Sequence, residues 1–312
     1  MQTTSLSLRD FSQIEHLEFL ARQVVEGFIL GLHKSPFHGF SVEFAEHRIY
    51  NPGEPIRYVD WKVFGRTDRL YSKKFEEETN LRCQIVIDNS SSMYFPETAA
   101  PSGNFAVNKV TYSAVCAAAI IQLLKTQRDA AGLSLFADTV GLHTKAASGN
   151  VHHQLLFNHL ERFLGEKSRN RPTQAAACLH QIAEQLHRRS LVIIFSDMME
   201  GGGQETEELF AALQHLRYNK HEVVLFHVVD RSKELDFTYD NKPYVFVDME
   251  TGEKVRIRGA DVKQQYVNQM KDYLKHLKLR CQQYRIDFVE ADINKDFQQV
   301  LLPYLIKRTK LK

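Results

Sequence analysis

Three oxygen-bearing side chains follow one apolar run at alternate positions. Asp88, Ser90 and Ser92 come directly after residues 83–87, which read Cys-Gln-Ile-Val-Ile. One carboxylate and two hydroxyls from a single turn of backbone are hard oxygen ligands of the kind that Mg²⁺ takes in near-octahedral geometry. The spacing therefore predicts a divalent-cation site, provided that other segments bring further oxygens to the same place. Without them, residues 90–92 simply begin a turn after a strand.

Strands and helices that could position these side chains alternate from residue 81 onward. Segments of strand length that are rich in apolar residues occur at residues 81–87, 132–140, 191–195, 223–229 and 286–290, and the one at 191–195 is apolar throughout. Apolar residues at helical spacing occur at residues 107–125, 153–164, 174–188, 205–217, 261–284 and 295–307. Residues 141–145 are expected to form a hairpin with the strand before them. Because the strands are apolar at nearly every position, we predict an α/β fold with a mostly parallel sheet and helices on both faces.

Further oxygens fall at two other predicted element ends. Asp197 follows the strand at 191–195, and Thr173 comes just before the helix at 174–188. In open parallel sheets, ligands bind in the crevice beyond the carboxyl ends of the strands. We therefore predict a site for Mg²⁺ or Mn²⁺ formed by Asp88, Ser90, Ser92, Thr173 and Asp197. Taken singly, Thr173 also suits a helix N-cap, and Asp197 could cap the loop that follows it.

The remaining segments suggest two regions. Residues 1–80 hold a predicted helix at 11–34, an irregular arm rich in Arg and aromatic residues, and a possible strand at 71–79. Residues 81–312 hold the strand–helix alternation, with a hairpin-like insertion around 237–258 whose tip is expected at 248–253.

The arm contains a group of charged and aromatic residues that admits two interpretations. Its members are Arg48, Arg57, Asp60, Trp61 and Arg66. Trp and Arg are enriched in protein-binding hot spots, which favours a surface for docking a partner. The alternative is a buried, salt-bridged corner that anchors the arm.

Composition excludes several classes of function. The formal net charge is +2, which lacks the clustered basic footprint of a nucleic-acid-binding protein. No apolar stretch reaches the roughly 20 residues needed to cross a bilayer, and residues 1–10 do not resemble a signal peptide. The four cysteines are scattered, without zinc spacing. We expect a cytoplasmic protein with no nucleic-acid partner and no membrane insertion.

The site motif and the segments around it resemble known families. Asp-x-Ser-x-Ser after a strand, a later Thr and a later Ser-Asp resemble the metal-ion-dependent adhesion site (MIDAS) of von Willebrand factor A domains. From about residue 15 to the C-terminus, the chain is similar to the bacterial family named domain of unknown function fifty-eight (DUF58). The similarity rests on His33-Lys34-Ser35, Gly39, Glu43-Phe44, Arg48, Tyr50, Pro52-Gly53-Glu54, Arg57, Val59-Asp60-Trp61-Lys62, Arg66-Thr67, Leu70-Tyr71, Lys74-Phe75, Leu302-Pro303-Tyr304-Leu305 and Arg308. Glu54 departs from the usual Pro-Gly-Asp of the family but keeps the carboxylate.

The resemblance implies both a fold and a partner. It implies a von Willebrand factor A-like (Rossmann-like) fold with a magnesium-type site, although the segment before Thr173 lacks the Gly-Gly-Thr often seen in such domains. It also implies a MoxR-type AAA+ ATPase partner and a role in chaperone-like maturation or remodelling of other proteins. The expected function is a non-enzymatic, metal-dependent protein-binding module whose ion accepts a carboxylate from the ATPase or its client.

Two other functions stay open at this point. The same ion could activate water in a hydrolase, with Glu200 or Glu205 as the general base. The chain could also be a scaffold that binds no metal.

Overall fold

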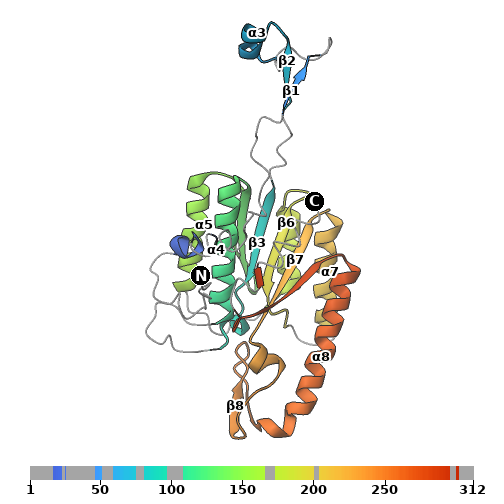
Figure 1. Ribbon diagram of the computed structural model, residues 1–312. Helices are drawn as coiled ribbons and strands as arrows, with labels where there is room; N and C mark the ends of the chain where they lie inside the picture. Colours follow the sequence, from blue (N-terminus) through green and yellow to red (C-terminus); the bar gives the residue numbers. More distant parts are fainter. Residues whose placement is uncertain are drawn as a thin grey trace, which may run out of the picture. The chain divides into compact units, whose positions relative to one another are not determined.

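The computed structural model describes residues 17–22, 25, 46–50, 59–74, 81–96, 108–165, 173–199, 204–295 and 300–301 (Figure 1). Contacts between Cα atoms divide the chain into residues 37–80 and the remainder. The described part of the first helix, residues 17–22, therefore belongs with the sheet, whereas the sequence suggested one region over 1–80. Leu17 and Leu20 are buried, and Glu18 forms an ion pair of 2.7 Å with Lys125.

A six-stranded sheet in the order β10-β7-β6-β3-β4-β5 forms the centre of the larger unit. Its strands are β3 (Arg82–Asp88), β4 (Ala130–Phe136), β5 (Val140–His143), β6 (Leu191–Ser196), β7 (Glu222–Val229) and β10 (Asp287–Asp292). Every neighbouring pair is parallel except β4 and β5, which form the predicted hairpin. The prediction of a mostly parallel α/β sheet is confirmed.

Helices cover both faces of this sheet (Figure 1). The helices are α4 (Lys109–Gln127), α5 (Asn150–Gly165), α6 (Ala175–Gln185), α7 (Gln204–Tyr218) and α8 (Gly259–Gln283). α4 and α5 lie on one side, and buried residues of α6, α7 and α8 pack on Val86, Val192 and Leu225 of the other. The central strands β3, β6 and β7 are buried on both faces for this reason, and their apolar composition follows from it. No helix in the described ranges is long and apolar enough to cross a bilayer.

The insertion before α8 is a β-hairpin, as predicted. The short helix η3 (Arg231–Leu235) precedes it, and β8 (Pro243–Val247) pairs antiparallel with β9 (Lys254–Arg258). Asp248 forms the turn by accepting the backbone N–H groups of Glu250 and Thr251 at 2.8 and 2.9 Å.

The described residues of the smaller unit form a short antiparallel pair of strands and one helix. β1 (Glu46–Ile49) pairs with β2 (Tyr71–Lys74), so the described part of the predicted strand at 71–79 is confirmed. Helix α3 (Trp61–Thr67) starts at Asp60, whose carboxylate accepts the N–H groups of Lys62 and Val63 as an N-cap.

The predicted element ends differ from the observed ones by a few residues. The predicted strand at 132–140 extends too far, because β4 ends at Phe136 and a turn leads into β5. The predicted helix at 174–188 is three residues too long, because the backbone of Leu186 is extended. Of the predicted helix at 295–307, the described residues Val300 and Leu301 are helical.

Candidate functional site

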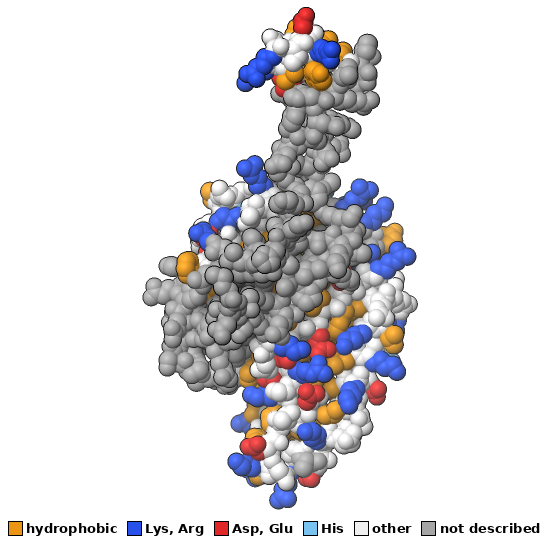
Figure 2. All heavy atoms as spheres, viewed as in Figure 1, with side chains coloured by type: hydrophobic (Ala, Val, Ile, Leu, Met, Phe, Trp, Pro, Cys, Tyr) orange, Lys and Arg blue, Asp and Glu red, His pale blue; other side chains and the backbone are white. Residues whose placement is uncertain are grey.

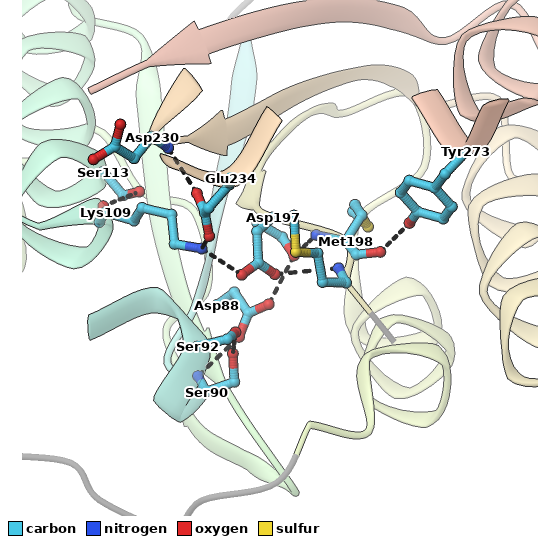
Figure 3. Close-up of polar contacts among 12 residues, drawn as sticks. Asp88, Ser90, Ser92, Lys109, Ser113, Asp197, Met198, Asp230, Glu234 and Tyr273 are labelled. Carbon is cyan, nitrogen blue, oxygen red and sulfur yellow. Dashed lines mark hydrogen bonds and ion pairs between the residues drawn. The ribbon is translucent and has the colours of Figure 1, made fainter. Parts of the chain in front are cut away.

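Asp88 and Asp197 leave the sheet at the same edge. β3 and β6 are adjacent and parallel, with Ile87 beside Phe195. Asp88 ends β3, and Asp197 follows Ser196, the last residue of β6. Both aspartates are buried, and their carboxylates lie close together in Figure 3. The parallel register therefore assembles the two carboxylates that the sequence placed at strand ends.

The serines after β3 surround the Asp88 carboxylate. Asp88 Oδ1 accepts the Ser90 backbone N–H at 2.9 Å, and Oδ2 accepts the Ser196 hydroxyl at 2.7 Å. The Ser90 and Ser92 hydroxyl oxygens are 3.1 Å apart. The turn interpretation is also correct, because residues 91–94 form a 3₁₀ helix, η2. Four of the five predicted ligands, Asp88, Ser90, Ser92 and Asp197, therefore lie at one place (Figure 3).

Lys109, which the sequence analysis did not identify, is the cation of this site. Its Nζ atom is 2.8 Å from Asp197 Oδ2 and 2.6 Å from Glu234 Oε1, and its side chain is fully buried. The other oxygen of Asp197 accepts the Met199 N–H at 3.2 Å, which matches the predicted loop cap. One sequence signal existed: a lysine in the first turn of a helix opposes the helix dipole. Glu234 carries no such signal.

The two aspartates differ in how readily they hold a proton. Burial, together with the charge of Asp197, raises the pKa of Asp88 to about 7. Burial would also raise the pKa of Asp197, but the Lys109 ammonium and the Ser92 hydroxyl lower it overall. The two carboxylates hold the pKa of Lys109 above its ordinary value despite burial. Lys109 thus neutralises Asp197, whereas the hydrogen-bond donors of Asp88 are the neutral groups of Ser90 and Ser196.

This arrangement fits a hard divalent cation. Asp88 and Asp197 are buried beside each other, and Lys109 supplies one positive charge, which contacts Asp197 and Glu234. A cation beside Asp88 would compensate the charge that burial now disfavours. Within the described ranges, no three Asp, Glu, His or Cys side chains form a ligand group. The serine hydroxyls and water would therefore complete the coordination.

Thr173 does not hydrogen-bond to the other four predicted ligands. Its backbone N–H donates to Glu250 Oε2 at 3.2 Å, and its buried hydroxyl has no hydrogen-bond partner among the described residues. The N-cap interpretation is wrong, because Gln174 occupies that position of α6. Thr173 therefore lies one residue before the cap. The Gln174 N–H is held by the Ala137 carbonyl, which accepts its hydrogen bond.

The alternative of a hydrolase requires a general base. Glu200 and the side chain of Glu205 lie outside the described residues. Glu234 is near, but one of its oxygens is bound to Lys109 and the other accepts the Asp230 N–H at 2.7 Å.

The arm residues lie in the smaller unit. Asp60 is buried and caps α3. Trp61 is exposed and makes an edge contact with Phe64, and Arg66 is exposed in the last turn of α3. Arg57 and the side chain of Arg48 lie outside the described residues. The choice between a docking surface and an anchoring corner stays a prediction, although Asp60 has a structural role.

Comparison with solved structures finds low similarity. A BatB protein from Bacteroides thetaiotaomicron gives a TM-score of 0.42 at 14% identity, covering 74% of this chain and all of that one. An aerotolerance-related membrane protein from Bacteroides fragilis gives 0.41 at 15% identity, covering 73% and 99%. Scores at this level carry no argument about function.

Comparison with sequences identifies a family. Uncharacterised proteins of Mycobacterium tuberculosis (Rv1480) and Mycobacterium bovis (Mb1516) are each 25% identical over 183 residues. The match covers 59% of this chain and 55% of those relatives, so the chain spans little more than half of their length. The family model described as "Protein of unknown function DUF58" matches residues 46–275. The chain therefore belongs to the DUF58 family, as its residue pattern suggested.

Proposed function

We propose that this chain is a non-enzymatic, divalent-metal-dependent protein-binding module with a von Willebrand factor A-like fold. Mg²⁺ or Mn²⁺ is held by Asp88, Ser90, Ser92 and Asp197, with the buried Thr173 hydroxyl as a fifth oxygen. The observation that carries the proposal is the Asp88 carboxylate, which is buried beside Asp197 and bonded to neutral donors. A cation supplies the compensation that this group lacks.

The chemistry of the ligands suggests what the ion does. Hydroxyl ligands carry no formal charge, and Asp197 is already paired with Lys109. When bound, the ion would thus remain electrophilic and accept an oxygen from outside. A partner's carboxylate is the hard oxygen ligand that best suits such a position.

The partner proposed from the family resemblance is a MoxR-type AAA+ ATPase, or the client protein on which that ATPase acts. The chain would then contribute recognition, and the ATPase would contribute the energy for chaperone-like maturation or remodelling. The chain itself has no Gly-rich phosphate loop followed by Lys-Ser or Lys-Thr, so nucleotide hydrolysis belongs to the partner.

A pull-down with a purified MoxR-type ATPase from the same organism tests this function. We expect capture by the wild type with Mg²⁺, and loss of capture with EDTA or in Asp88→Ala. The matched control is Asp272→Ala, an exposed aspartate of α8, which should capture normally. Capture that persists both in EDTA and in folded Asp88→Ala would contradict metal-dependent binding.

A further inference from the structure

A groove of about 850 Å³ lies between the β8–β9 hairpin, α8 and the loops of the site. The hairpin contributes Phe246 and Val255 to its walls, and α8 contributes Val262 and Tyr266. The hairpin is held by aromatic contacts, since the Phe237 ring lies 5.6 Å from Phe246 and 4.7 Å from Tyr266. The groove is therefore formed by packed elements of a single unit.

One end of this groove is the carboxylate site. Ser92, Met199 and Glu234 line the groove, and each of them also contacts a group of the site. The Ser92 hydroxyl lies 3.1 Å from that of Ser90, the Met199 N–H donates to Asp197, and Glu234 binds Lys109. A segment bound in the groove would thus reach the oxygens of the site.

The hairpin tip approaches the same end. Glu250, from the tip, accepts the backbone N–H of Thr173 at 3.2 Å. This contact places the tip beside the fifth oxygen of the proposed metal site. The hairpin therefore forms a wall of the groove beside the carboxyl ends of the strands.

The lining of the groove combines apolar surface with acidic charge. Its apolar part includes Val255, which is 52% exposed. Among the described residues, four carboxylates line it, those of Glu234, Asp248, Glu250 and Glu253, and no Lys or Arg does. The surrounding surface differs, because Figure 2 shows basic and acidic side chains side by side over α8 and the hairpin. The charge of the lining is thus specific to the groove.

We infer that this groove binds a partner segment in which an acidic residue is followed by apolar residues and a Lys or Arg. The inference rests on the proposed function, in which the acidic residue reaches the ion. Apolar side chains would cover the exposed valine and the aromatic wall, and the basic residue would face the acidic tip. A segment with acidic residues throughout would be repelled by the same carboxylates.

Two labelled synthetic peptides test this inference by fluorescence anisotropy with the full chain and Mg²⁺. Both contain one Asp and the same apolar residues, and they differ in carrying Lys or Glu at the remaining positions. We expect tighter binding of the Lys peptide. Glu253→Lys should reduce that preference by about fivefold, and Val255→Ser should weaken binding of the Lys peptide by about three- to tenfold.

Matched variants outside the groove serve as controls. Val245→Ser removes a 50% exposed valine of the same hairpin, and Asp272→Lys reverses an exposed charge on α8; neither residue lines the groove. Each control should stay within about twofold of the wild type. Equal binding of the two peptides, or equal losses in variants and controls, would overturn the inference.

The same assay separates the groove from the metal. If the ATPase is captured in a Mg²⁺-dependent way but the peptides are not distinguished, the groove inference fails and the proposed function stands. If the Lys preference persists in EDTA and in Asp88→Ala, the groove inference stands and the metal dependence fails.

Discussion

Two segments of this chain carry the same short pattern at the end of a buried strand, and the structure uses them differently. Asp88-Asn89-Ser90 begins at the last residue of β3, and Asp230-Arg231-Ser232 comes directly after β7. The aspartates of both are 2% exposed. Asp230 Oδ1 accepts the Ser232 hydroxyl at 2.7 Å, the Asn294 amide at 2.9 Å and the Lys233 N–H at 3.3 Å, as the N-cap of η3. That carboxylate therefore has a structural role, which is to join η3 to the segment after β10.

Asp88 has the same burial but a different neighbour. Its donors are the Ser90 backbone N–H and the hydroxyls of Ser90 and Ser196, and the second buried carboxylate, Asp197, lies beside it. Asp-x-Ser after a strand therefore does not by itself predict a metal site. The charge next to the carboxylate decides whether a cation is needed.

The comparison predicts its largest effect in metal binding. Asp88→Asn should lower the affinity for Mg²⁺ by more than about 100-fold, because it removes the negative charge and one oxygen of a ligand. Asp230→Asn should leave that affinity within about twofold, since its carboxylate is bonded elsewhere. Isothermal titration calorimetry with Mg²⁺ and Mn²⁺ measures both. An equal loss in the two variants would remove the distinction between the segments.

Lys109 is expected to have the largest effect on stability. Lys109→Met leaves Asp197 and Glu234 buried without their cation, and should lower the free energy of unfolding by about 3–5 kcal/mol. Lys125→Met is the matched control: its partly exposed ion pair with Glu18 should cost less than about 1 kcal/mol. Urea unfolding measures the difference, and added Mg²⁺ should recover part of the loss in Lys109→Met alone. Similar costs in the two variants would contradict the assignment of Lys109 as the cation of the site.

The stability of the metal-free protein should depend on pH through Asp88. Its pKa is about 7 in the folded chain against an ordinary value of 3.8, so the contribution of the protonated group is complete below pH 3.8. That contribution is lost as the pH rises from about 4 through about 7. The unfolding free energy of the wild type relative to Asp88→Asn should fall across this range, and Mg²⁺ should oppose the fall. A difference in unfolding free energy that does not change with pH would show that the pKa of Asp88 is not raised in the folded chain.

The serines two residues after each aspartate should give the smallest effects. Ser232→Ala removes a hydroxyl donor from Asp230 and should cost about 1 kcal/mol of stability, without a change in metal affinity. Ser90→Ala should lower Mg²⁺ affinity by about tenfold. Parallel calorimetry and urea unfolding separate the two outcomes. If Ser232→Ala lowered the Mg²⁺ affinity and Ser90→Ala did not, the metal site would lie at the end of β7 and not at the end of β3.

The local elements are predictable because each carries its own periodic signal. The strand at 191–195 is near the observed β6, because a continuous apolar run reflects burial on both faces. The helix at 107–125 is near the observed α4, whose residues from Lys109 to Leu124 are all buried. Element ends are less predictable, as α6 illustrates: Thr173 was expected near the cap, and Gln174 occupies it. Terminal residues depend on contacts such as the Gln174–Ala137 hydrogen bond, which no local pattern contains.

By itself, the sequence determined that Asp88 and Asp197 stand at the ends of buried strands in an α/β chain, because alternation and hydrophobic runs are local properties. Tertiary structure alone decided that Lys109, 88 residues before Asp197 and 125 before Glu234, is their buried cation. It also decided that Asp230, in the same pattern as Asp88, is a helix cap. The physical reason is that a buried charge is defined by the partners that the packed fold brings within hydrogen-bond distance, and those partners come from distant segments.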